Sequence, residues 1–406
     1  MGDKKTNPHA AVFLVIGAGL VTIARAMTLS FLAIKLQETF GLGPAMIGFL
    51  LGLGPLIGAV TAPLAGSISD RVGRRVVLSL TLVWMAFAMI GMGLAETVFA
   101  FCLAQSAASV AISIYGPISR ALMSDICAKP ERLKYFSWRY TASNVGWAIG
   151  PLIGVLAGIA STGLFITAGT VYAALAIALQ FLKLPPRQHA DCRASEQASL
   201  IKSLVAAMSD PQLIYFVGAS TLLIAVYGQW TSTLAPYLTQ SIAGGAEIFA
   251  YLVSINGVVV LTGNPIARRF IESAGPLRAL WVGCVLLGFG QVGFMVSTGL
   301  PEFALSMVVF TAGEILVVPS EYTLVDRISN VQNRGSYFGA HSLSTVGGFL
   351  GPTVGGVTLG IFGGPAMFLM FAGSAAFGAL LFILGTQIQP PGAKGRNVSR
   401  SGTHDC

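Results

Sequence analysis

Four charged residues lie within long apolar stretches of the sequence: Arg25, Arg120, Glu314 and Glu321. In a membrane such residues normally face a cavity or a partner of opposite charge, and they mark paths for substrates, ions or protons. Two interpretations follow. Either the arginines and glutamates neutralise one another as buried pairs, or they bind a charged solute and move protons.

The second interpretation gives each charge a role. Desolvation makes a carboxyl group in mid-membrane hold its proton more tightly, whereas a nearby arginine has the opposite effect. A substrate that competes for the arginine would therefore change the affinity of the acid for protons. On this basis we predict that Glu314 carries the coupling proton. Glu321 is the second candidate, because a spacing of seven places both acids on nearly one helix face.

The arginines and the polar residues near them indicate the charge and polarity of the substrate. Arg25 favours a solute with an anionic group, such as a carboxylate metabolite or a siderophore, whereas unpaired glutamates would attract cations. Polar and aromatic side chains on the same stretches suit an amphipathic compound. Together with Arg25 and Arg120, the predicted cavity residues are Gln105, Tyr115, Tyr227, Gln229 and Trp230.

The composition shows that the elements that must position these residues lie in a lipid bilayer. The 406 residues are 54% hydrophobic and only 10% charged, with a mean hydropathy of +0.76, whereas soluble domains carry about 25% charged residues. Apolar runs of about 20 residues recur throughout, and lipid forces such spans to be helical. We predict an all-α membrane protein with twelve transmembrane helices, near 11–36, 44–66, 76–95, 98–122, 138–160, 164–184, 212–238, 247–267, 278–298, 303–325, 337–360 and 365–386.

The distribution of positive charge predicts the orientation. If both termini lie on one side, that side receives all but three of the 24 lysines and arginines, as cytoplasmic loops do. We therefore predict cytoplasmic termini and a multi-pass protein of a bacterial inner membrane. The net charge of +8 needs no nucleic-acid partner. The N-terminal apolar run is expected to be the first span and not a cleaved signal, because it is too long and lacks a cleavage site.

The chain also repeats itself at half its length. Several motifs recur at an offset of 202, including Pro63-Leu64-Ala65 as Pro265-Ile266-Ala267, and Gly150-Pro151 recurs as Gly351-Pro352 at 201. Such a regular offset predicts two six-helix halves in the same orientation, a known transporter plan in which substrate binds between the halves. The predicted parts are an N-terminal half (1–182), a cytoplasmic linker (183–211), a C-terminal half (212–388) and a cytoplasmic tail (389–406).

Three segments carry a resemblance to a known family. The segment GSISDRVGRR (66–75) is similar to the loop motif of the major facilitator superfamily between spans 2 and 3. The segment GWAIGPLIGV (146–155) resembles the span 5 motif of the proton-coupled exporters of this superfamily, and GFLGPTVGG (348–356) is a second copy in span 11. Together with GEILVVP (313–319), the pattern resembles the twelve-span multidrug and metabolite efflux branch, the drug:proton antiporters. One departure concerns proton coupling, because Cys102 stands where that branch often has an arginine before Gln105.

The loop motif is expected to act as a cytoplasmic gate. Asp70 would lie at the C-terminal end of span 2, where the helix dipole disfavours an anion, so it needs a partner such as the N-terminus of span 11. The resemblance implies such a latch, and the alternative is a charged anchor that only sets the topology. The residues that match the motif or extend it are Gly66, Asp70, Arg71, Gly73, Arg74 and Arg75.

The glycine-proline motifs are expected to lie where the two halves move. Proline bends a helix, and small residues four apart allow close helix packing. We predict that spans 5 and 11 use them against partners from the other half, although they could equally form an ordinary packing face. The resemblance also implies a central cavity lined by spans 1, 4, 7 and 10. The motif residues are Gly146, Gly150, Pro151, Gly154, Gly351, Pro352 and Gly355.

These features predict a proton antiporter that exports a small amphipathic drug or metabolite by alternating access. The alternative is a proton-coupled uptake symporter for a small anion or a sugar-like nutrient. A membrane sensor would need a soluble domain that the sequence lacks. The chain has no P-loop and no HExxH motif, so we expect no enzymatic activity and no cofactor other than the proton gradient. The scattered cysteines predict no metal site. The expected partners are a small molecule, protons and the lipid bilayer, and the protein is expected to be a monomer.

Overall fold

The computed structural model describes residues 6–54, 56–57, 72–128, 131–158, 161–182, 209–228, 230–329 and 334–388. Within these ranges the regular structure is entirely helical, which confirms the predicted class of secondary structure. The helices are α1 (Pro8–Leu29), α2 (Leu32–Phe40), α4 (Arg74–Leu94), α5 (Val98–Ile126), α6 (Arg132–Leu156), α7 (Thr162–Phe181), α9 (Pro211–Tyr227), α10 (Trp230–Ser241), α11 (Gly245–Ala274), α12 (Pro276–Val296), α13 (Leu300–Ile328), α14 (Arg334–His341), the short 3₁₀ helix η2 (Ser342–Val346) and α15 (Gly347–Gln387).

Nine helical stretches in the described part of the chain are long and apolar enough to cross a membrane. The stretch Pro8–Phe40 joins α1 to α2, and a shorter apolar helix covers Pro44–Gly54. The stretch Ser342–Gln387 begins after α14, five residues later than the predicted start at 337. It contains Gly363, whose φ of 81° is non-helical and marks a kink within α15.

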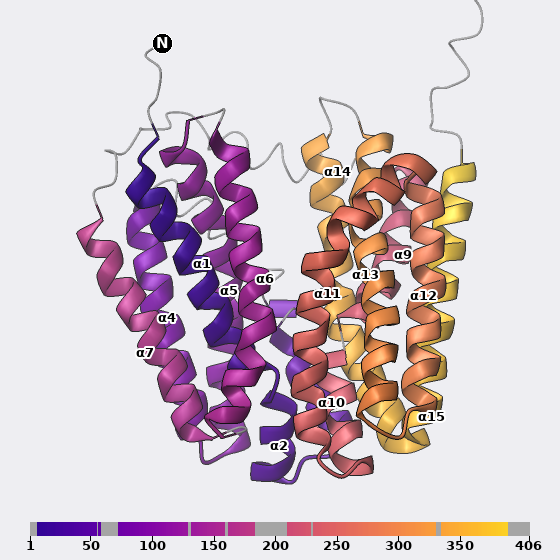
Figure 1. Cartoon of the computed structure of the whole chain (residues 1–406), viewed down its shortest axis with the longest axis horizontal. Coiled ribbons are helices and arrows are strands. Elements are labelled where there is room, and N and C mark those ends of the chain that lie inside the picture. The colour runs from indigo at the N-terminus through magenta and orange to yellow at the C-terminus, as the bar shows by residue number, and fades with distance from the viewer. Residues whose placement is uncertain are drawn as a thin grey trace, which may run out of the picture.

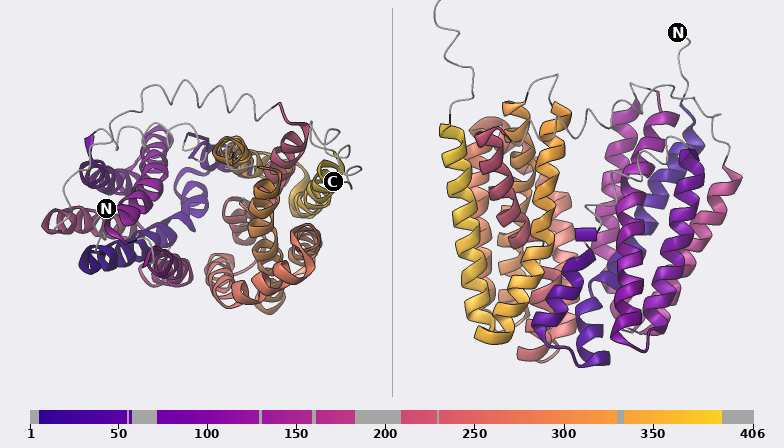
Figure 2. Two further views of the ribbon diagram at one scale, coloured as in Figure 1. Left: turned by 90° about the horizontal axis from the view of Figure 1, so that it is seen from above. Right: turned by 180° about the vertical axis from the view of Figure 1, so that it is seen from behind.

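The helices form two groups that lie side by side (Figure 1). One group contains α1, α4, α5, α6 and α7, and the other contains α9 and α11 to α15. Figure 2 shows the same two groups from above and from behind. Helices α2 and α10 lie between them at the end of the molecule farthest from the N-terminus, which we call the distal end (Figure 1). The opposite end, where α1, α4, α9 and α14 begin, is called the proximal end.

Local backbone features recur between the two groups. The six described glycines with positive φ fall into three pairs about 200 positions apart: Gly41 with Gly244, Gly73 with Gly275, and Gly158 with Gly363. The first helix of each group also begins alike. Asn7 caps α1 ahead of Pro8, and Asp210 caps α9 ahead of Pro211. An internal repeat predicts such recurrence, because positive φ and a capped helix start are each set by one residue.

The glycines of the span 5 motif pack inside one group, and the prediction that they contact the other half is wrong. A Cβ on Gly150 would lie 2.6 Å from the Ala26 Cβ, and one on Gly146 would lie 2.8 Å from the Thr22 Cβ, both on α1. The second copy is divided, because a Cβ on Gly351 would lie 2.8 Å from the Cα of Ala225 on α9 in its own group, whereas a Cβ on Gly356 would lie 3.2 Å from the Cα of Gly48 in the other group. Periodicity identifies the small face of each helix, but it does not identify the neighbour.

Other faces of these helices make the contacts between the groups. Gly257 of α11 meets α6, since an added Cβ would lie 2.9 Å from the Cα of Ala148. At the distal end, Gly48 faces the carbonyl of Pro352 and the Cα of Gly356 on α15. At the same end, the Thr239 hydroxyl of α10 donates a hydrogen bond of 3.2 Å to the Oε1 atom of Gln37 on α2.

Candidate functional site

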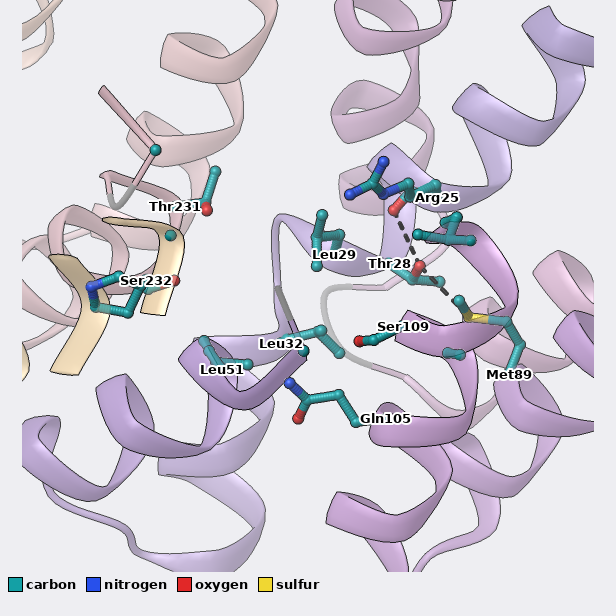
Figure 3. A pocket seen from close by; sticks show the side chains of 16 residues that line it. Arg25, Thr28, Leu29, Leu32, Leu51, Met89, Gln105, Ser109, Thr231 and Ser232 are labelled. Atoms are coloured by element: carbon teal, nitrogen blue, oxygen red, sulfur yellow. Dashed lines mark hydrogen bonds between the residues drawn. The ribbon is translucent and has the colours of Figure 1, made fainter. Parts of the chain in front are cut away.

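A cavity of about 290 Å³ lies between the two groups of helices (Figure 3). Its walls come from α1, α2, the helix Pro44–Gly54, α4 and α5 on one side, and from the α9–α10 junction, α10 and α15 on the other. Apolar side chains from six of these elements, among them Leu29, Leu32, Leu51 and Met89, form much of the lining. The polar lining residues are Arg25, Thr28, Gln105, Ser109, Thr231 and Ser232.

Arg25 supplies the positive charge of this cavity. Its guanidinium lies 5.8 Å from the centre of the Trp147 ring, a cation–π contact with α6. Within the described ranges no hydrogen bond or ion pair reaches the guanidinium. The neighbouring Thr28 hydroxyl is occupied, because it donates to backbone carbonyls of α1, including that of Arg25 at 3.0 Å. The guanidinium therefore retains donors for a molecule that enters the cavity.

Gln105 supplies a second polar group. Its Nε2 donates to the carbonyl of Leu50 at 3.1 Å, which ties α5 to the helix Pro44–Gly54. Its Oε1 has no hydrogen-bond partner although the residue is only 6% exposed. A buried amide oxygen without a donor is costly, and a ligand N–H or O–H group would satisfy it. In Figure 3 Arg25 and Gln105 border the cavity on either side of Leu32 and Ser109.

The other predicted cavity residues lie elsewhere. Tyr115 is buried beside Arg139 of α6, and Arg120 lies near Tyr322 of α13. Trp230 packs its ring against Phe249 of α11 at a centroid distance of 5.8 Å. Tyr227 is a neighbour of Glu321, and Gln229 lies outside the described residues. Of the predicted set, Arg25 and Gln105 are the members that line this cavity.

Glu314 and Glu321 of α13 do not line this cavity, and neither does Arg120, so Arg25 is the one of the four deepest charges that borders it. The Oε2 atom of Glu314 accepts a hydrogen bond of 3.0 Å from the Asn256 amide of α11, which also donates to Thr311 at 3.0 Å. Glu321 is 1% exposed, and its Oε1 atom has no hydrogen-bond partner. Helix α13 packs against α11 and α12, which holds both acids inside the second group.

Mutual neutralisation of the buried charges is also absent from the described residues. No ion pair joins Arg25 or Arg120 to Glu314 or Glu321. The arginines belong to the first group of helices, and the glutamates belong to the second. Asn256, which sequence reasoning overlooked, is the described partner of Glu314. A lone amide in the apolar stretch YLVSINGVVV (251–260) is the signal that could have identified it.

Part of the loop motif is described. Gly66, Asp70 and Arg71 lie outside the described residues, so the latch stays a prediction. Gly73 precedes α4 with a φ of 111°, a conformation that favours glycine. Arg74 forms an ion pair of 3.0 Å with Asp125 of α5. Arg75 donates to the carbonyl of Gln180 at the end of α7, where the helix dipole favours a cation.

A fold of apolar helices in two groups, with a cavity between them and charges at membrane depth, defines a membrane transporter. The model of the Major Facilitator Superfamily matches residues 14–348, and the chain belongs to this family. Its members are transporters and not enzymes. The predicted resemblance is thereby confirmed.

Relatives and solved structures agree with this membership. The chain is 29% identical over 359 residues to the uncharacterized MFS-type transporter YqjV of Bacillus subtilis, with 86% of each chain covered. It is 24% identical over 384 residues to the multidrug resistance protein MdtG of Salmonella paratyphi C, covering 90% of this chain and 92% of that protein. The crystal structure of a mutant of the nucleoside transporter NupG superposes with a TM-score of 0.81 at 17% identity, covering 93% of this chain and 99% of the other, which shows the fold.

Proposed function

We propose that the protein exports a small amphipathic organic anion in exchange for protons. The observation that carries the proposal is the Arg25 guanidinium, which borders a largely apolar cavity between the groups without an anionic partner in the described residues. A carboxylate would accept from the guanidinium, an apolar body would contact Leu29, Leu32 and Leu51, and a donor would satisfy Gln105. The relative named as a multidrug resistance protein supports export.

Glu314 is the proposed carrier of the coupling proton. Its hydrogen-bond donor Asn256 adjoins Gly257, the residue of α11 that packs against Ala148 of α6. An ionised carboxyl group only accepts hydrogen bonds, whereas a protonated one also donates through its O–H group. The two forms therefore bind an amide differently. The charge of Glu314 would therefore affect the position of α11 at its contact with the other group. This provides a physical link between proton binding and the movement of the groups.

The membrane potential favours this direction of transport. An anion leaving the cell and a proton entering it both move positive charge inward, and each charge is worth about 2.3 kcal/mol per 100 mV. One anion exchanged for one proton would thus gain about 4.6 kcal/mol per 100 mV. Export of an anion by this route needs no other source of energy.

The finer topology belongs to the same proposal. We propose twelve spans in two halves, with α1–α2 and α9–α10 each forming one span and α15 forming two spans separated at Gly363. The proximal end would be cytoplasmic, in the inner membrane of a bacterium, and the working unit would be a monomer. In this orientation the distal contacts, Gly48 with α15 and Thr239 with Gln37, lie on the outer side of the membrane.

Transport into membrane vesicles tests the proposal. Everted and right-side-out vesicles are given a pH gradient of either sign, and the uptake of radiolabelled 1-naphthoate is compared with that of tetraphenylphosphonium. Proton antiport predicts naphthoate accumulation in everted vesicles that are acidic inside. Accumulation in right-side-out vesicles that are alkaline inside would instead support a symporter, and preference for tetraphenylphosphonium would reject an anionic substrate.

The role of Glu314 has its own test. Glu314→Gln retains the shape of the side chain but cannot exchange a proton, so it should abolish naphthoate transport driven by the pH gradient. Exchange of labelled for unlabelled naphthoate across the same membrane requires no net proton movement and should continue. Gradient-driven transport that survives in this variant would rule out Glu314 as the carrier.

A further inference from the structure

A second cluster of ionisable and hydroxyl side chains lies inside the second group, away from the cavity. His341 ends α14 and is 3% exposed, and its Nε2 lies 2.9 Å from the Ser220 hydroxyl of α9. Ser220 and Tyr227, which both lie on α9, are polar neighbours of Glu321 on α13. Ser220 thus stands between a buried imidazole and a buried carboxyl group. The three residues come from three different helices.

The surroundings of this cluster hold no described cation that would neutralise Glu321. The titratable groups near Glu321 are Tyr227 of α9, Cys284 of α12 and Tyr322 of α13, and Tyr322 also contacts His341. No ion pair involves Glu321 within the described residues, and its Oε1 atom lacks a hydrogen-bond partner. A core that served packing alone would be more stable with apolar side chains at these positions. The cost indicates a function.

The cluster also has a route towards one end of the molecule. The Tyr322 ring meets the His341 ring edge to face at 5.5 Å, and Tyr322 itself is half exposed. One helical turn earlier on α14, Tyr337 donates a hydrogen bond of 2.6 Å to Asp210 at the proximal end. His341 therefore lies between the interior acid and the proximal end, which the proposed orientation places in the cytoplasm.

We propose that Glu321, Ser220 and His341 form a proton relay between the interior of the second group and the proximal end. The inference rests on the proposed proton coupling and assigns the route by which a proton leaves. The carboxyl O–H of Glu321 gives its proton to the Ser220 oxygen while the Ser220 hydroxyl proton passes to Nε2 of neutral His341. Glu321 ends as a carboxylate, Ser220 regains a hydroxyl, and the imidazolium then releases one proton to water.

Ser220→Ala tests the relay, because it removes the bridging hydroxyl. Thr221→Ala is the matched control, since the Thr221 hydroxyl donates to the Val217 carbonyl of its own helix at 2.8 Å. His341→Gln provides a second variant that retains a polar side chain but cannot carry a proton. Each purified variant is placed in proteoliposomes, and two rates are measured: transport of labelled 1-naphthoate driven by a pH gradient, and exchange of labelled for unlabelled 1-naphthoate.

The relay predicts that Ser220→Ala and His341→Gln slow gradient-driven transport about tenfold or more, as loss of a positioned proton-transfer group does, and leave exchange within about twofold of wild type. Thr221→Ala should retain both rates. Unchanged gradient-driven transport in Ser220→Ala would overturn the relay alone, and so would an equal loss of both rates. Exchange by the wild-type protein without any response to a pH gradient would overturn the relay together with the proposed coupling.

Discussion

Replacing Gly48 with valine should open the distal end of the molecule. A Cβ at this position would collide with the Pro352 carbonyl and lie 3.2 Å from the Cα of Gly356, both on α15 of the other group. Because these atoms belong to a helix backbone, they cannot move aside as a flexible side chain would. The collision exists only while the two groups touch at this end. The substitution therefore penalises this conformation and not the fold of either group.

The magnitude follows from the packing. Overfilling a tight contact costs about 1–3 kcal/mol, and a differential cost of this size changes the ratio of two conformations about 5- to 150-fold. Gly43→Val is the matched control, because Gly43 lies five residues earlier in the chain and a Cβ there would have no atom within 4 Å. It should leave the ratio unchanged.

Electron–electron distance measurements between two spin labels can follow this ratio. With the five native cysteines replaced, labels are attached at Glu96, between α4 and α5, and at Thr298, between α12 and α13. Both residues are exposed. The long-distance population should rise in Gly48→Val and stay at the wild-type level in Gly43→Val. An unchanged distribution in Gly48→Val would refute the inference that this contact holds the distal end closed.

Two further predictions concern stability. Gly150→Val should destabilise the protein by about 1–3 kcal/mol, because its Cβ would crowd the Ala26 Cβ at 2.6 Å. Gly163→Val should not, because no atom lies within 4 Å of the new Cβ. Equal melting temperatures of the two variants in detergent would contradict this prediction. Tyr337→Phe should cost about 1 kcal/mol by removing the hydrogen bond to Asp210. Tyr337 precedes the apolar stretch Ser342–Gln387, and burial, followed by this hydrogen bond, raises the pKa of Tyr337 to about 12. The pKa of this tyrosine in the unfolded chain is about 10, so the stabilisation is complete below about pH 10 and is lost as the pH rises towards 12. A wild-type melting temperature equal to that of Tyr337→Phe at every pH in this range would contradict the assignment.

Sequence reasoning reached the fold because the relevant signals are local. Apolar length and low charge predict membrane helices without knowledge of their neighbours, and Arg25 could be placed at a cavity because a charge in lipid needs one. Glycines four apart likewise showed that α6 has a face for close packing. That this face meets α1, and that Ala148 meets the other group, depends on three-dimensional arrangement.

The candidate site was only partly predictable for the same reason. Gln105 was chosen for its polarity, and it lines the cavity. The partner of Glu314 is Asn256, 58 positions away on another helix, and no periodicity in either segment relates the two. From the sequence, Arg25 and Glu314 could form an ion pair because their charges are opposite, but the structure places them in different groups of helices. Such non-local contacts decide which charges neutralise each other and which stay available.

Proton release on substrate binding tests the central claim most directly. Purified protein in weakly buffered detergent solution receives 1-naphthoate while a pH indicator dye records protons, and Arg25→Gln serves as the comparison. Because antiport requires the anion and the proton to be bound in turn, it predicts release of protons by the wild-type protein and none by Arg25→Gln. Uptake of protons by the wild-type protein, or binding of naphthoate with no change in pH, would contradict exchange of an organic anion for protons.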